Sequence, residues 1–220
     1  MSPASCLELS VVSLRRSSSA RLFVLIGALC LALVVSLGLA DPAAAAGQIT
    51  FAGSATVRPA KASKAAKPTA AQVKGARKVA GKGGVSALRT LHSLPGSAGV
   101  HLVWNDPALG SHLGGVRIGS TTTVLLNSRR LAGKPSLARD VVRHEIAHIY
   151  QGRLMRTYGL TWAQLGRRLA PAFGTNGQEK VADCVARSFG ATWTGYTSRC
   201  SGSAKHAWVK AMIGGYLPRR

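Results

Sequence analysis

Two histidines four residues apart constrain the fold of this chain more than any other feature. His144 and His148 lie in the segment His-Glu-Ile-Ala-His at residues 144–148. Apolar residues recur around this segment with helical spacing, at Val141, Val142, Ile146 and Ile149. We predict a helix from about residue 136 to about residue 154, with Ser136 after Pro135 as its N-cap. Side chains four apart share one helix face, so both imidazoles can bind one metal ion.

Three acidic residues complete a candidate site in a chain that has few of them. Asp and Glu number 7 against 29 Lys and Arg, so each acidic position is informative. Glu145 would lie beside the metal, where its carboxylate can accept a proton from a water molecule. A catalytic zinc needs three protein ligands, and we assign Glu179 as the third. Asp183 can accept a hydrogen bond from the outer nitrogen of a ligating histidine.

Each of these residues also has a simpler interpretation. Glu179 can be an acid that stabilises a helix N-terminus. Asp183 can pair with Arg187, four residues later. The two histidines can be ordinary residues of a helix. The motif and the scarcity of acidic residues favour the metal site.

Residues 144–148 followed by Glu179 and Asp183 on a later helix resemble the gluzincin branch of zinc metallopeptidases. More closely, the chain is similar to small exported minigluzincin-like peptidases of actinobacterial type. The resemblance covers roughly residues 102–191. In the metzincin branch a third histidine would stand six residues after His148, but Leu154 occupies that position.

The resemblance implies a zinc-dependent endopeptidase that hydrolyses peptide or protein substrates with metal-activated water. It implies that His144, His148 and Glu179 bind Zn²⁺, that Glu145 is the general base and that Asp183 supports a ligand. It also implies that the strand at residues 122–126 is the sheet edge on which an extended peptide pairs. An oxyanion-stabilising residue is expected too. Tyr196 and His206 are the candidates for it, whereas Tyr150 and Tyr158 are expected to be packing residues.

The rest of the C-terminal region predicts a small α+β domain. Strands are expected at residues 100–104, 115–118 and 122–126, with a hairpin turn near residues 119–120. Further helices are expected at residues 161–169, ending near Pro171, at 178–189 and at 204–213. A short antiparallel sheet or hairpin followed by the motif helix and further helices is a zincin-like arrangement.

The N-terminal part predicts export. Arg15, Arg16 and Arg21 precede an uncharged apolar run at residues 22–40, and an alanine block follows at residues 43–46. This order is typical of a signal peptide cleaved after Ala46 or Ala40. An uncleaved signal anchor is the alternative, because the run is almost long enough to span a bilayer. We therefore assign residues 1–46 to a signal peptide or anchor, and expect a secreted or extracytoplasmic protein.

Residues 47–85 are rich in Ala, Lys and Gly, and we interpret them as a disordered basic linker before a domain at residues 86–220. The net charge of +22 favours anionic surroundings. The linker can thus bind an anionic cell-wall polymer or membrane surface, or be a solvated spacer. The alternative function is a catalytically inactive zinc-binding domain attached to such a surface. No known nucleic-acid-binding signature supports a nucleic-acid partner.

The cysteines divide between these regions. Cys6 and Cys30 lie in the targeting segment, which leaves Cys184 and Cys200 as an even pair in an exported domain. We predict a disulfide between them.

Overall fold

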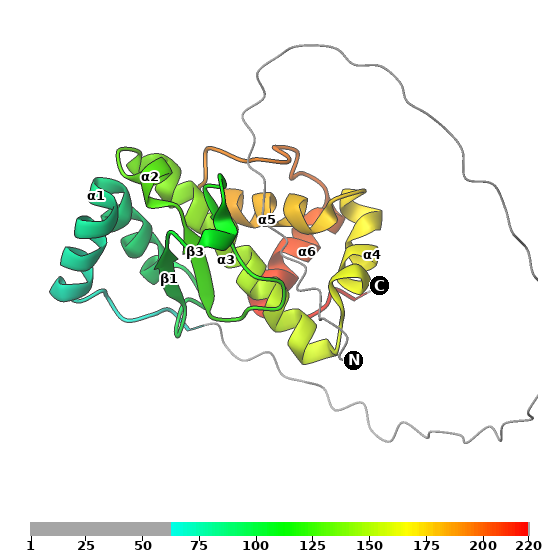
Figure 1. Ribbon diagram of the computed structural model, residues 1–220. Helices are drawn as coiled ribbons and strands as arrows, with labels where there is room; N and C mark the ends of the chain where they lie inside the picture. The colour runs from blue at the N-terminus through cyan, green and yellow to red at the C-terminus, as the bar shows by residue number, and fades with distance from the viewer. Residues whose placement is uncertain (1–62, 220) are drawn as a thin grey trace, which may run out of the picture. The chain divides into compact units, whose positions relative to one another are not determined.

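The structure, a computed structural model, describes residues 63–219. The elements in chain order are α1 (Ala70–Ser93), β1 (His101–Trp104), η1 (Pro107–Leu109), β2 (Gly114–Gly115), β3 (Thr123–Leu126), α2 (Ser128–Leu131), α3 (Pro135–Tyr158), α4 (Trp162–Phe173), α5 (Gly177–Ser188) and α6 (Ser203–Gly214). The predicted α+β class is confirmed. Helix α3 runs between α1, α2 and the sheet on one side and α4, α5 and α6 on the other (Figure 1).

Helix α1 corrects the predicted linker. Residues 70–85, assigned to a disordered segment, form most of this helix, so the folded domain begins before residue 86. Thr69 caps the helix, because its hydroxyl accepts a hydrogen bond from the Gln72 backbone N–H while the Gln72 side chain accepts one from the Thr69 N–H. The helix kinks at Ala80 and Gly81. Residues 47–62 and the predicted targeting segment lie outside the described residues.

The buried side of α1 explains why the sequence interpretation failed there. It is formed largely by small residues, among them Ala76, Ala80, Gly83 and Gly84. A Cβ atom on Gly83 would lie 1.9 Å from the backbone oxygen of Leu131 in α2. Helix α1 therefore packs by close backbone approach, which needs residues with little or no side chain. A search for large apolar side chains misses such a surface.

The sheet has the strand order β1-β3-β2 and is mixed. Strand β2 pairs with β3 in the antiparallel sense, as the predicted hairpin requires, whereas β1 pairs with β3 in parallel. Of the second strand, predicted at residues 115–118, only Gly115 pairs with β3; the other paired residue of β2 is Gly114, just before the predicted start. Strand β3 is central and hydrogen-bonded on both sides, so the prediction that residues 122–126 form the sheet edge is wrong. Among the described strands, β1 and β2 are the edges.

Helix α3 forms the centre of the core. The predicted apolar face is confirmed, because Val141, Val142, Ile146 and Ile149 are all fully buried. The helix begins at Pro135 with Lys134, rather than Ser136, as its N-cap. It continues four residues beyond the predicted end and stops at Tyr158, where Gly159 takes a left-handed conformation with φ 60°.

The three C-terminal helices lie close to their predicted positions. Thr161 caps α4 through a reciprocal pair of hydrogen bonds with Gln164. Pro171 does not end α4, which continues to Phe173. Proline there removes one backbone hydrogen bond, but burial of Leu169 and Phe173 on either side holds the last turn against the core.

None of the helices found in residues 63–219 combines the length and the apolarity needed to cross a bilayer. The apolar run at residues 22–40 lies outside this range. The predicted disulfide between Cys184 and Cys200 is present. Such a bond is typical of an oxidising, extracytoplasmic compartment.

Candidate metal centre

Helix α3 places the two motif histidines side by side in the protein interior. His144 is 1% exposed and His148 is 5% exposed. Their Nε2 atoms are 3.2 Å apart, and the two rings meet edge to face with centroids 5.0 Å apart. The expectation that their four-residue spacing would bring both imidazoles to one point is confirmed.

Helix α5 brings the predicted carboxylate to the same point. The Oε2 atom of Glu179 lies 3.4 Å from Nε2 of His144 and 3.3 Å from Nε2 of His148. Tetrahedral coordination with bonds of about 2.0–2.1 Å places ligand atoms about 3.3–3.4 Å apart. The three side chains therefore form a group that can hold a metal ion, and its spacing fits that coordination.

The outer nitrogen of each histidine ring has a defined partner. Nδ1 of His144 is 2.9 Å from Oδ1 of Asp183, as the sequence predicted. A carboxylate only accepts hydrogen bonds, so Nδ1 carries a proton and Nε2 is the ring nitrogen that can bind a metal ion. Nε2 faces the point that His148 and Glu179 share. Asp183 therefore sets the tautomer of His144 that metal binding requires.

His148 has an amide partner that sequence reasoning missed. Its Nδ1 lies 2.9 Å from Oε1 of Gln151, and the Gln151 amide nitrogen donates to the backbone oxygen of Gln178 at 2.7 Å. Because the amide nitrogen must be the end that donates to Gln178, the end facing His148 is the oxygen. Nδ1 of His148 therefore donates a hydrogen bond to Oε1 of Gln151. Gln151 lies three residues after His148, on the same helix face, and this spacing is the signal that could have identified it.

Glu145 lies near the two histidines and Glu179, whose charges act on its carboxylate, in a space that Gly114 provides. Its carboxylate is fully buried, and neither oxygen has a hydrogen-bond partner within residues 63–219. A Cβ atom on Gly114 of β2 would lie 2.9 Å from Oε1 of Glu145 and 2.6 Å from a methyl carbon of Val141. Any larger residue at position 114 would displace one of them. A buried acid without a partner fits a site that receives an ion and water.

Burial and neighbouring charges shift the pKa values of this cluster. Burial raises the pKa of Glu145 to about 6. Burial opposes the charged form of His144, but its hydrogen bonds to Asp183 and Glu179 outweigh this and raise its pKa to about 10. Burial also disfavours the charged form of Glu179, yet the adjacent histidines, His148 first, lower its pKa far below the ordinary range. The Glu179 carboxylate is thus held ionised, while Glu145 stays able to exchange a proton near neutral pH.

Two aromatic residues flank the candidate centre. The Tyr196 ring stacks on His144, with centroids 6.1 Å apart and planes 20° apart. Burial, followed by the charges of Glu179, Glu145 and Asp183, raises the pKa of the Tyr196 hydroxyl. The Trp162 ring lies 6.2 Å from that of His148. A small recess leads to the site, lined by residues 116–119, His148, Trp162 and Glu179.

The other oxyanion candidate lies elsewhere. His206 is exposed on α6, in a hollow formed with Val209, Lys210, Ile213, Gly214 and Tyr216. None of these residues belongs to the group of His144, His148 and Glu179 or to the recess beside it, so no contact links His206 to that group among the described residues. Helix α6 packs against α3, α4 and α5 and buries Ala211 and Met212, whereas His206 is exposed to solvent. Tyr150 is a packing residue, as expected, and its hydroxyl donates to the Pro95 backbone oxygen.

Comparison of the chain with models of protein families, with curated proteins and with solved structures gave no match. The site geometry and the sequence motif are therefore the basis for assigning a function.

Proposed function

We propose that this protein is a zinc-dependent metallopeptidase of gluzincin type. The observation that carries the proposal is the arrangement of three ligand atoms 3.2–3.4 Å apart, with the Glu145 carboxylate buried beside them. Two imidazoles and one carboxylate are a ligand set known from catalytic zinc peptidases, which leave a fourth position open. A purely structural zinc site would be closed by a fourth protein ligand. Among residues 63–219 no fourth ligand joins the group.

His144, His148 and Glu179 would hold the ion, which when bound supplies Lewis-acid polarisation of a carbonyl and acidification of water. Glu145 has the position and the raised pKa of a general base. It would take a proton from the attacking water and deliver it to the leaving amine of the peptide bond. Tyr196, stacked on His144, is the candidate that we favour for stabilising the oxyanion.

The substrate strand would pair with β2 rather than with β3. Strand β3 is paired on both sides, whereas β2 is paired only with β3 among the described strands. Residues 116–119 continue from β2 along the recess that contains His148 and Glu179. An extended peptide added to this edge would run past the ligands.

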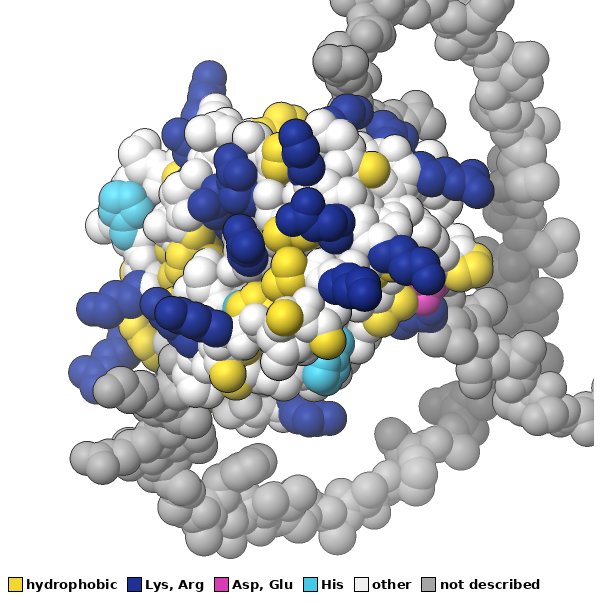
Figure 2. Space-filling view, turned by 90° about the vertical axis from the view of Figure 1, so that its left-hand side faces the viewer, with side chains coloured by type: hydrophobic (Ala, Val, Ile, Leu, Met, Phe, Trp, Pro, Cys, Tyr) yellow, Lys and Arg dark blue, Asp and Glu magenta, His cyan; other side chains and the backbone are white. Residues whose placement is uncertain are grey.

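The second candidate function, an inactive zinc-binding domain attached to an anionic surface, is favoured by the charge of α1 and α2. Every Lys and Arg on these two helices is exposed, and neither helix has an acidic residue: Lys74, Arg77, Lys78, Lys82, Arg89, Arg129 and Arg130. Figure 2, which views the molecule from the α1 side of Figure 1, shows Lys and Arg spread over this face with very little acidic surface. We call these residues the cationic face. An anionic wall polymer or membrane would be attracted to it, whether or not the enzyme is active.

Activity and metal content distinguish the two candidates. The full chain is purified, its zinc content is measured, and a library of unstructured peptides is offered as substrate. We expect one zinc per chain and peptide cleavage, with Glu145→Gln retaining the zinc and losing cleavage. Stoichiometric zinc without cleavage of any peptide would favour the inactive binding domain. Protein that takes up no zinc would exclude both.

A further inference from the structure

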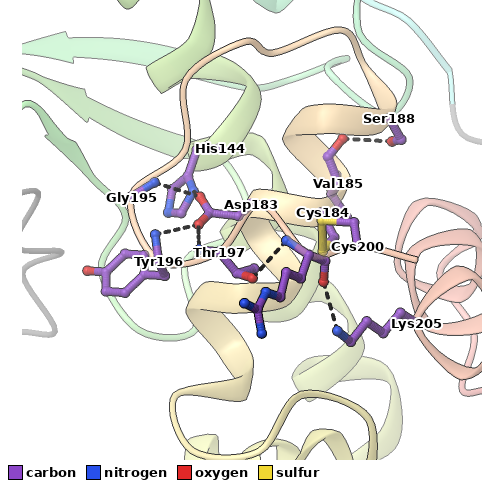
Figure 3. The surroundings of a disulfide bond; sticks show 11 residues. His144, Asp183, Cys184, Val185, Ser188, Gly195, Tyr196, Thr197, Cys200 and Lys205 are labelled. Carbon is purple, nitrogen blue, oxygen red and sulfur yellow. Dashed lines mark hydrogen bonds and ion pairs between the residues drawn. A yellow bond between two sulfur atoms is a disulfide. The ribbon is translucent and has the colours of Figure 1, made fainter. Parts of the chain in front are cut away.

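Asp183 is more than a partner for one histidine. Its side chain is fully buried, and besides His144 it accepts hydrogen bonds from three consecutive backbone N–H groups. These belong to Gly195, Tyr196 and Thr197, whose nitrogens lie 3.3, 2.6 and 2.7 Å from the carboxylate oxygens. Figure 3 shows the carboxylate between this segment and the His144 ring. Consecutive N–H groups that converge on an anion form a backbone nest.

The segment that forms this nest has no helix or strand of its own. Its first part is held to α3, because the backbone N–H groups of Thr192 and Trp193 donate to Asp140. Its last part returns to α5 at Cys200, which is bonded to Cys184, the residue directly after Asp183. The disulfide therefore lies three residues after the nest on one side and next to the carboxylate on the other.

This arrangement gives the nest a positioning task. A buried carboxylate is costly unless several donors satisfy it, and charge-assisted bonds to backbone N–H groups are strong and directional. With three such bonds fixed, Oδ1 of Asp183 stays directed at Nδ1 of His144. The same segment places the Tyr196 ring against His144. Residues 195–197 thus restrain the His144 ring in two ways. They act on its outer nitrogen through Asp183, and on one face of the ring through Tyr196.

We propose that residues 195–197, closed by the Cys184–Cys200 disulfide, form a positioning element for the metal ligand His144. Without the disulfide, the nest loses its closure and Asp183 loses part of its orientation, so His144 points less often at the shared site. The proposal rests on the metal site described above. It concerns metal affinity, and a disulfide that served only global stability would leave that affinity unchanged.

A double-mutant cycle on the full chain tests this coupling. Zinc affinity is measured by competition with a chromophoric chelator for four proteins: the natural chain, the Cys184→Ser/Cys200→Ser variant, Asp183→Ala, and all three substitutions combined. Serines are used because free thiols would bind zinc themselves. Loss of an outer partner of a ligating histidine weakens metal binding by roughly 10–100-fold. We expect the Cys184→Ser/Cys200→Ser variant to bind zinc about tenfold more weakly than the natural chain. In the Asp183→Ala background, the same two serine substitutions should weaken zinc binding little further.

Equal losses in both backgrounds would overturn the proposal, because the disulfide would then act independently of Asp183. A natural chain that binds no zinc would overturn the proposed function as well, so the two failures are distinguishable.

Amide hydrogen exchange on the unmutated chain provides a test that needs no variant to fold. If the nest supports His144, linkage requires that zinc in turn stabilises the nest. We expect zinc to slow exchange at residues 195–197 more than at Thr192 and Trp193, whose N–H groups bond to Asp140 instead. Equal slowing at both sets, or none at residues 195–197, would overturn the proposal.

Discussion

The α3–α5 pair and the α1–α2 pair use charge in opposite ways. Of the acidic residues within 63–219, all but Asp106 lie on α3 or α5. Glu145 and Asp183 are fully buried there, and Asp140 is 3% exposed. Helices α1 and α2 have no acidic residue, and their cations all face solvent.

The difference shows how one domain can be strongly basic and still build an acidic interior. A buried carboxylate needs donors, a cation or a metal ion around it. Asp140, Glu179 and Asp183 have such partners. Glu145 has none among the described residues, but it lies beside the group that can hold the ion. Exposed Lys and Arg need no such partners, because water solvates them. Four substitutions test this contrast, two at the metal group on α3 and two on α1.

Loss of a ligand should have the largest effect. His148→Ala removes one of the three proposed ligand atoms. Loss of a hydrogen-bond partner behind a ligand weakens metal binding by up to roughly 100-fold, and loss of the ligand itself should weaken zinc binding by more than that. Peptide cleavage should disappear with it. Zinc competition and thermal unfolding with and without a chelator measure both consequences. Zinc should raise the melting temperature of the natural chain and leave that of the variant unchanged; a similar rise in both would place the ion elsewhere.

Gln151→Ala should have the next largest effect. It deletes the acceptor for Nδ1 of His148 and leaves the three ligands in place. We expect zinc affinity to fall by about 10–100-fold, with zinc binding recoverable at higher concentration. Gln164→Ala is a suitable control, because Gln164 caps α4 on the surface. Equal zinc affinity for the natural chain and the Gln151 variant would show that this partner does not orient the ring.

Gly83→Ala should affect stability and leave the metal site unchanged. The new Cβ would lie 1.9 Å from the Leu131 backbone oxygen, so α1 and α2 must separate. Overpacking of this kind costs about 1–3 kcal/mol of unfolding free energy. Gly75→Ala meets nothing within 4 Å and should stabilise by up to about 1 kcal/mol. Urea unfolding of both variants measures this contrast, and a Gly83 variant as stable as the natural chain would refute the close approach.

The smallest effect is expected from one charge on the cationic face. Lys78→Gln should change the unfolding free energy by no more than about 0.5 kcal/mol and leave zinc affinity intact. Binding to vesicles containing phosphatidylglycerol should weaken by about 1 kcal/mol. Lys210→Gln on α6 is the matched exposed control. Equal weakening of vesicle binding in both variants would mean that the net charge of the protein, and not the cationic face, attracts the lipid surface. Soluble polyphosphate as a competitor separates lipid binding from general affinity for polyanions.

The site was largely predictable because its chemistry is local. His144 and His148 were identifiable from spacing within one helix, and Glu179 and Asp183 from the rarity of acids together with the same spacing. Gly114 was not identifiable, since its role depends on a strand passing over Glu145. The backbone donors of residues 195–197 were not identifiable either, because an N–H group carries no residue-specific signal.

The sequence by itself determined which residues can ligate, the helices that carry them and the pairing of Cys184 with Cys200. Those features follow from helical periodicity and from cysteine number, which are properties of short segments. Only the tertiary structure decided that α1 belongs to the domain, that β3 is central and that His206 faces solvent. Each of these depends on which surfaces meet across the chain, and that outcome is set by packing of the whole domain.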